Sequence, residues 1–265
     1  MDDQYSGNKM NGEHFKQIKE VEEMLLDVGT LLMSNGASTG RVRTTVSRIA
    51  EALGYEVELM IASRSLMLTV TEESGAAYTS SVRRTSSHGV NFKLVSGISR
   101  LSWRVIEDKL TVDQINEDIK RLTSLPHYPR LVVLSLVALA GASFCRLFGG
   151  HAPEMSVAFI ATFFGLFIRQ EAVRYRFNPY LAIAFASFGA SMISGFSVRL
   201  GIGSTPDVAL ATSVLFLIPG VPLINSLTDL IDGNTLNGIV RGVNGLIIAF
   251  AIALGLMFAM QVYGI

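Results

Sequence analysis

The second half of the chain is almost free of charge, and this feature limits what it can fold into. Residues 131–265 hold 6 of the 22 Lys and Arg residues, 5 of the 22 Asp and Glu residues, and no Lys. A segment of this length cannot cover itself with a hydrated surface when so few side chains are charged. We therefore expect this half to lie in lipid.

Apolar runs in this half have the length of membrane helices. A helix needs about 20 residues to cross the hydrocarbon core of a bilayer. Five runs approach that length, at 131–148, 155–168, 180–196, 208–231 and 239–262. The sequence thus predicts an α-helical transmembrane bundle of about five spans over 131–265, after a linker at 126–130 that contains two prolines.

The first half shows the mixed periodicity of a soluble α+β domain over residues 14–125. Hydrophobic spacing and turn residues predict helices at 13–34, 39–53, 92–109 and 112–122, and strands at 57–62, 66–71 and 76–82. Ser38 or Thr39 can cap the second helix, and Thr111 the last. Residues 1–13 are polar and lack the apolar core of a secretory signal, so we expect a disordered tail there.

The distribution of Lys and Arg predicts the orientation of the spans. Three Arg residues fall in 169–176, and Lys120, Arg121 and Arg130 precede the first span, whereas 149–154 and 197–207 contain only Arg199. Positive residues favour the cytoplasmic side. We expect a multi-pass protein of the cell (inner) membrane, with the N-terminal domain in the cytoplasm and the C-terminus outside.

A Pro219-Gly220-Val221-Pro222 segment interrupts the fourth run. Proline lacks an amide donor, and the residue before it disfavours helical conformation. We therefore predict two half-helices, 208–218 and 223–231. Backbone groups freed inside a bilayer persist only beside protein or a watery cavity, where they can bind a solute, and the N-terminus of the second half-helix can bind an anion.

Polar residues after this break complete the candidate transport path. Asn225 and Asp229 lie one helical turn apart, and Asp229 is our candidate for a proton-linked carboxylate, because acids inside a membrane commonly relay protons. Alternatively, Asp229 and Asp232 simply mark the cytoplasmic end of the span. On the last run Asn237, Arg241 and Asn244 form a stripe that either faces these acids or is only solvated. The candidate path is Pro219, Gly220, Pro222, Asn225, Asp229, Asp232, Arg241 and Asn244.

Two small-residue patterns favour helix packing over solute contact. Ser187, Ser191 and Ser194 form a seam on the third run. Gly238 and Gly242 form a GxxxG pair, which permits close approach of two helices but is a weak motif.

Patterns typical of enzymes lack their required context. Residues 36–40 match GxSxG, but a helix is predicted before them where a nucleophile elbow needs a strand. The four His residues are scattered without metal-ligand spacing, Cys145 is alone, and no phosphate-binding GxxxxGK loop occurs. We predict no enzyme activity, no metal and no cofactor, so that transport must draw on a gradient. The formal net charge of zero gives no reason to expect a nucleic-acid partner.

Three segments resemble one known family. Leu32-Met33-Ser34-Asn35-Gly36-Ala37-Ser38-Thr39, Phe216 to Ser226 with its PGxPLxN pattern, and Asp229-Leu230-Ile231-Asp232-Gly233 look like the threonine/serine exporter (ThrE) family. The likeness begins near residue 14 and covers nearly the whole chain. Full-length members carry a second, smaller membrane unit, so this chain resembles the half-length, YjjP-like members.

The resemblance implies gradient-driven export of a small hydrophilic solute, either threonine and serine or a dicarboxylate such as succinate. It also implies coupling to the proton motive force and a separately encoded, small YjjB-like membrane subunit as partner. Membrane lipid and the solute are the other expected partners. The sequence does not decide whether the chain forms a homo-oligomer. Two alternatives remain: a membrane-anchored enzyme or sensor that acts through the cytoplasmic domain, and a non-conducting partner of the true pore.

Overall fold

The computed structural model describes residues 3–72, 77–85, 89–126 and 128–264, with only the backbone described for residues 3–14. The chain divides into two compact units. Unit 1 consists of Met1–Pro126 and Val221–Gly242, and unit 2 consists of His127–Gly220 and Val243–Ile265. The first change of unit coincides with the predicted linker. The return of Val221–Gly242 to unit 1 differs from the predicted organisation, which assigned everything after the linker to the membrane half.

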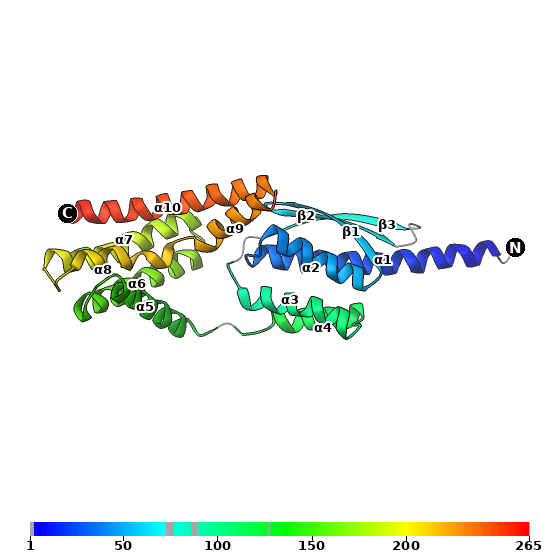
Figure 1. Cartoon of the computed structure of the whole chain (residues 1–265), viewed down its shortest axis with the longest axis horizontal. Coiled ribbons are helices and arrows are strands. Elements are labelled where there is room, and N and C mark those ends of the chain that lie inside the picture. Colours follow the sequence, from blue (N-terminus) through cyan, green and yellow to red (C-terminus); the bar gives the residue numbers. More distant parts are fainter. Residues whose placement is uncertain (1–2, 73–76, 86–88, 127, 265) are drawn as a thin grey trace. The chain divides into compact units, whose positions relative to one another are not determined.

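Unit 1 contains a three-stranded antiparallel sheet in the order β1-β2-β3, with two layers of helices on one face (Figure 1). Two helices pack on the sheet, and two more pack on those helices. The elements are α1 (Asp3–Ser34), α2 (Thr39–Ala52), β1 (Tyr55–Ala62), β2 (Ser65–Glu72), β3 (Tyr78–Arg84), α3 (Phe92–Glu107) and α4 (Val112–Thr123).

The core of unit 1 follows from the periodicity of its elements. Leu66, Leu68 and Val70 alternate along β2 and are fully buried, because alternate residues of a strand point to the same face. Two of the helices begin directly after N-capping residues. Ser38 accepts from the Arg41 amide, and Thr111 forms a capping box with Gln114, which confirms both predicted caps.

Helix α1 starts earlier than the sequence predicted. It begins at Asp3, so residues expected to form a disordered tail continue the helix. Among the residues whose burial is described, the buried face of α1 begins only at Ile18. Residues 3–14 include Gly, Asn, Ser and Asp, which are poor helix formers, so the sequence did not indicate this extension.

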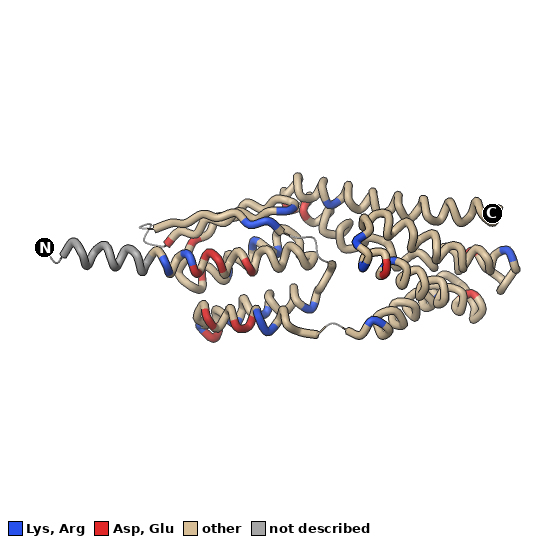
Figure 2. Tube along the Cα trace, turned by 180° about the vertical axis from the view of Figure 1, so that it is seen from behind, with Lys and Arg blue, Asp and Glu red and all other residues tan. Residues whose placement is uncertain are grey.

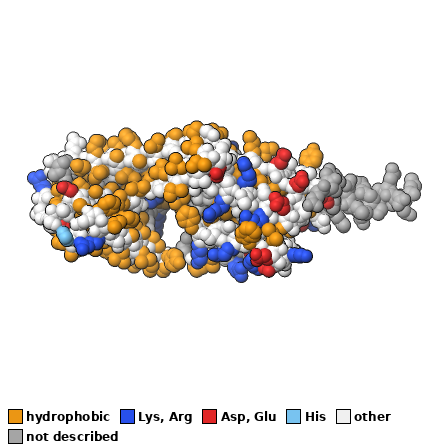
Figure 3. Space-filling view, in the orientation of Figure 1, with side chains coloured by type: hydrophobic (Ala, Val, Ile, Leu, Met, Phe, Trp, Pro, Cys, Tyr) orange, Lys and Arg blue, Asp and Glu red, His pale blue; other side chains and the backbone are white. Residues whose placement is uncertain are grey.

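Unit 2 is a helical bundle whose surface is largely apolar. Figure 2 shows few charged residues along its helices, and Figure 3 shows hydrophobic side chains over the visible part of their surface. Its elements are α5 (Arg130–Leu147), α6 (Ala152–Arg174), α7 (Pro179–Arg199), α8 (Pro206–Ser213), the single 3₁₀ turn η1 (Leu215–Leu217) and the later part of α10 (Thr235–Tyr263).

Among the described residues, four helices are long and apolar enough to cross a membrane. The number rises to five if α8 with η1 and the next helix, α9 (Gly220–Ile231), form one interrupted span. Large side chains such as Leu136, Leu139 and Phe144 are exposed on α5, as expected of a surface that faces lipid. Inside the bundle the helices approach closely, and a Cβ on Gly255 would meet the backbone of α7.

The predicted arginine-rich loop at 169–176 is wrong in its extent. Helix α6 continues to Arg174, so that Arg169 and Arg174 are helical, and Arg176 lies just beyond the helix with φ of 57°. An ion pair from Arg130 to Glu171 stabilises these last turns.

Candidate functional site

The predicted interruption of the fourth apolar run is confirmed, although its position differs in detail. Helix α8 ends at Ser213, η1 follows, and α9 begins at Gly220. Pro219 lies in the break itself. Pro222 instead lies in the first turn of α9, where an amide has no intrahelical partner and its absence therefore costs little. The second half-helix accordingly starts three residues before the predicted Leu223.

Asp229 on α9 lies at the N-terminus of α2. Its carboxylate is fully buried, and it accepts hydrogen bonds from the Thr39 amide at 2.9 Å and from the Thr39 hydroxyl at 3.0 Å. Thr39 is the first residue of α2, so the carboxylate meets the positive end of that helix dipole. Both groups belong to unit 1.

Arg241 on α10 neutralises this buried carboxylate. Its Nε lies 3.2 Å from Asp229 Oδ2, and its Nη2 donates to the Ala37 carbonyl at 3.0 Å. The Arg241 side chain is 23% exposed, whereas Asp229 is not exposed at all. The expectation that the polar stripe on the last run faces Asp229 is therefore confirmed for Arg241.

Asn225 binds the loop between α1 and α2, and Asn237 binds strand β1 and the first residue of α2. Asn225 donates to the Gly36 carbonyl at 2.9 Å, and Gly36 itself has φ of +91°, a conformation that favours glycine. Asn237 donates to the Ile61 carbonyl at 2.8 Å, and its Nδ2 lies 3.4 Å from Thr39 Oγ1. Segment 36–39 is thus bound by side chains that follow it by about two hundred residues in sequence.

The GxSxG match has a structural role. Ser38 is the N-cap of α2, and helix α1 precedes it, as the sequence predicted. The loop therefore lacks the strand-turn-helix geometry that exposes a catalytic serine.

The other predicted residues do not join this cluster. Asp232 is exposed near Gly40, whose Cβ, if present, would lie 3.1 Å from Asp232 Oδ2. Asn244 belongs to unit 2 and accepts from the Tyr180 hydroxyl at 3.0 Å. Pro219 and Gly220 also belong to unit 2. The structure brings Asn225, Asp229 and Arg241 together.

Sequence reasoning missed two residues of the cluster. Thr39 was considered only as a helix cap, and Asn237 was placed in the polar stripe but not in the candidate path. The available signal was the family resemblance, which is carried by segments 32–39, 216–226 and 229–233. In the structure the first of these segments is hydrogen-bonded to Asn225 of the second and to Asp229 of the third.

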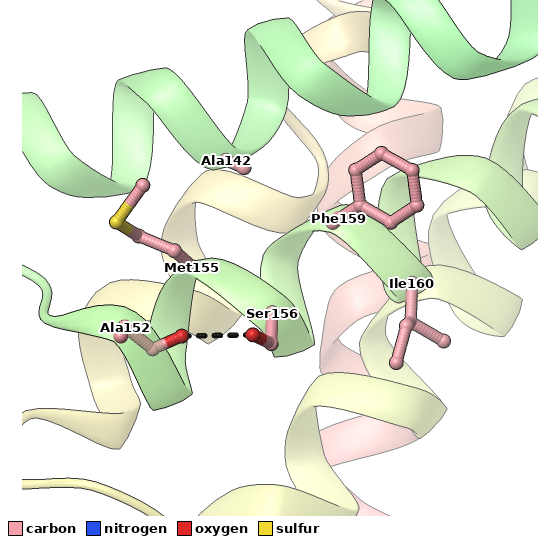
Figure 4. A pocket seen from close by; sticks show the side chains of 6 residues that line it. All are labelled: Ala142, Ala152, Met155, Ser156, Phe159 and Ile160. Atoms are coloured by element: carbon pink, nitrogen blue, oxygen red, sulfur yellow. Dashed lines mark hydrogen bonds between the residues drawn. The ribbon is translucent and has the colours of Figure 1, made fainter.

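Unit 2 contains buried hydroxyl groups and one apolar pocket. Ser187 donates to the Ile252 carbonyl at 2.7 Å, and Ser194 lies 3.1 Å from the Ser213 hydroxyl, so these two hydroxyls join neighbouring helices. The pocket measures about 410 Å³ and lies between α5 and α6 (Figure 4). Its one hydroxyl, on Ser156, donates to its own helix, which makes the pocket unsuitable for a hydrophilic solute. The lining residues are Ala142, Ala152, Met155, Ser156, Phe159 and Ile160.

Comparisons with known proteins agree with the resemblance. The model of the family described as "Putative threonine/serine exporter" matches residues 23–263. The "Probable succinate transporter subunit YjjP" of Escherichia coli (strain K12) is 29% identical over 94% of this chain and 97% of its own length. The protein of the same name from Klebsiella aerogenes is 29% identical over 93% and 95%. The "Probable threonine/serine exporter" of Mycobacterium tuberculosis is 22% identical over 92% of this chain but only 46% of its own length. No solved structure matches significantly.

Proposed function

We propose that this chain, which belongs to the threonine/serine exporter family, is one subunit of a gradient-driven exporter of a small hydrophilic metabolite. The solute is threonine or serine, or a dicarboxylate such as succinate. A separately encoded, YjjB-like membrane subunit supplies the rest of the exporter, because the relatives of similar length are named as subunits.

The observation that carries this proposal is the interrupted helical run in the apolar half. A plain membrane anchor has no need of a break between Ser213 and Gly220, since freed backbone groups are costly in lipid. Broken helices of this kind occur in secondary transporters, where the freed groups bind solutes and ions. In this proposal Pro219, Gly220 and Pro222 create the opening.

Asp229 has the role of a proton-linked carboxylate in this proposal, and Asn225, Asp232, Arg241 and Asn244 contribute polar contacts along the path. Arg241 is ion-paired with Asp229, and Asp232 lies on the turn that follows α9. Protonation of Asp229 would remove the charge that Arg241 and the α2 N-terminus stabilise. The pair could then separate and re-form during a transport cycle.

The proposed orientation places the N-terminal domain in the cytoplasm and the C-terminus outside. Basic residues before α5 and at the end of α6 support it, since positive residues favour the cytoplasmic side. These residues are Lys120, Arg121, Arg130, Arg169, Arg174 and Arg176.

Metabolite efflux tests the proposal. Cells that lack their own exporters of threonine, serine and succinate would be loaded with each solute, and efflux followed with this chain, its partner, or both. We expect efflux with both subunits and its loss with Asp229→Asn at unchanged membrane abundance. Asp207→Asn is the matched control, because Asp207 is an exposed acid of the same apolar half.

Two outcomes would count against the proposal. Undiminished efflux with Asp229→Asn would remove Asp229 from the mechanism. Efflux with the partner alone would make this chain a non-conducting assembly partner. A sensor or enzyme formed by the N-terminal domain alone is less well supported, because unit 1 also includes Val221–Gly242.

A further inference from the structure

We infer that the N-terminus of α2 is a carboxylate-binding site that Asp229 fills in this structure and that the carboxylate of the solute can occupy in its place. This inference rests on the proposed function and deepens it by naming the group of the solute that is recognised and the residues that recognise it.

The groups around the Asp229 carboxylate are those that bind a free carboxylate. Thr39 offers a backbone amide at 2.9 Å and a hydroxyl at 3.0 Å, and Arg241 offers a guanidinium at 3.2 Å. A helix N-terminus combined with an arginine is a strong anion-binding arrangement. All three are donors to oxygen, and none of them requires that the carboxylate be attached to α9.

Asn237 provides an independent sign of a ligand. Its Oδ1 is buried and has no hydrogen-bond partner among the residues that the structure describes, and the whole residue is only 7% exposed. Its Nδ2, on the same amide group, lies 3.4 Å from Thr39 Oγ1, so this group borders the carboxylate site. A buried acceptor without a donor is unfavourable for folding. A carboxylate ligand with a nearby ammonium or hydroxyl group would supply that donor.

Arg241 is the residue of this site that reaches the protein surface. Asp229 and Thr39 are buried, but the Arg241 side chain is 23% exposed. Because Asp229 is tethered, its effective concentration is high and a free solute competes with it only weakly. Weak binding suits a transporter, which must also release its solute.

Carboxylate rescue of Asp229→Ala tests the site directly. The full chain would be purified in detergent with its partner, and its thermal unfolding midpoint measured in sodium acetate and in sodium chloride of equal ionic strength. We expect the variant to lose several degrees and acetate at about 100 mM to restore at least half of the loss, since a ligand of the folded state stabilises it by mass action. Wild-type protein, whose site is filled, should show no shift specific to acetate.

Matched variants assign the rescue to this site. Adding Thr39→Val or Arg241→Gln to Asp229→Ala should abolish it. Asp113→Ala removes an exposed acid from the first turn of α4 and should show no acetate effect. Glycine, which is acetate with an added ammonium group, should rescue more strongly than acetate. Equal rescue by the two would remove Asn237 from the ligand set, and absence of any rescue would overturn the inference.

Hydrogen exchange on wild-type protein keeps the inference testable if Asp229→Ala does not fold. With L-threonine or succinate at saturating concentration, we expect faster amide exchange in α9 while the amides of Thr39–Arg41 stay protected. Unchanged exchange with both solutes would overturn the inference. If wild-type efflux persists in that case, only the carboxylate site fails. If rescue succeeds but efflux is absent, only the proposed function fails.

Discussion

The two units each contain a fully buried carboxylate, and the two carboxylates are held in different ways. Glu154, in the first turn of α6, accepts from the amides of His151 at 3.0 Å and Thr205 at 2.8 Å. The hydroxyls of Ser204 and Thr205 lie 3.4 Å away. All these donors are neutral, and no described cation forms an ion pair with Glu154. Asp229 instead contacts a partly exposed arginine and the N-terminus of a helix that lies far from it in the sequence.

This difference separates a carboxylate that holds a loop from one that can change partners. Glu154 closes a capping box with the residue three positions before it and fastens the loop between α7 and α8. Its two shortest contacts are backbone amides, which cannot turn away. Asp229 also accepts from one backbone amide, but its other two partners are side chains that can rotate, and the arginine is partly exposed. We expect substitutions to affect folding at both sites, but to affect transport only at Asp229.

The largest effect should come from Arg241→Gln. It leaves the Asp229 carboxylate buried without its cation, and breaking a buried pair from one side costs about 3–5 kcal/mol. A double-mutant cycle with Asp229→Asn, followed by denaturant unfolding in detergent, would measure the coupling. We expect the double variant to lose less free energy of unfolding than the two single variants lose together. Additive losses would show that the pair is not an energetic unit.

Gly203→Ala should have the next largest effect, and it tests the site of Glu154. Gly203 has φ of +87°, and a Cβ there would overlap the Glu154 carboxylate. The conformation alone costs a non-glycine residue about 1–2 kcal/mol, and the displaced carboxylate adds to it. Gly201→Ala is the control, since Gly201 also has a positive φ of +66°, but a Cβ there would have no atom within 4 Å. Equal losses in the two variants would mean that Glu154 does not need this space.

Thr39→Val should cost about 1.5–3 kcal/mol, the usual contribution of a hydrogen bond to a charged group. It removes the hydroxyl donor of Asp229 but keeps the amide and the shape of the side chain. Thr39→Ser retains the hydroxyl and should recover most of the stability. Thr205→Val removes the weaker hydroxyl contact to Glu154, at 3.4 Å, and should cost less. A reversed order of the two valine variants would contradict the comparison.

Glu154→Gln should have the smallest effect on transport. We expect efflux at the wild-type rate per folded protein, because Glu154 lies outside the proposed path. The amide oxygen of Gln can replace only one of the two carboxylate oxygens that accept from the His151 and Thr205 amides, so the variant should lose abundance rather than transport rate. Efflux assays normalised to membrane abundance would check this, alongside Asp229→Asn. Loss of efflux with Glu154→Gln at normal abundance would show that transport requires Glu154 as well as Asp229, and would contradict the comparison.

Much of the fold could be predicted because local signals fix it. The helix over 39–53 and its Ser38 cap, the three strands, and the interruption at Pro219 all follow from spacing, capping residues or proline geometry. Errors occurred where those signals are weak. The first residues of α1 include few strong helix formers, and the last turns of α6, where Glu171 pairs with Arg130, contain charged residues in place of a continuous apolar run.

The candidate site was only partly predictable for a different reason. Asp229, Asn225 and Arg241 stood out as polar residues in apolar surroundings. Their principal partners, the Gly36 and Ala37 carbonyls and the Thr39 amide, are backbone groups about two hundred positions away. Backbone donors and acceptors leave no compositional trace, so a single sequence could not show that α9 binds this loop.

The discontinuity of unit 1 has a consequence for the order of assembly during synthesis. The bond between Thr39 and Asp229 joins residues 190 positions apart. When the ribosome has finished Pro126, the last donors and acceptors of the first piece are still without partners, and four helices of unit 2 are made before Val221–Gly242 arrives. Closing so large a loop is slow compared with local folding. The hydrophobic core of the N-terminal piece lies within residues 18–122 and can form early, whereas the bond between Thr39 and Asp229 can close only after most of the chain has left the ribosome.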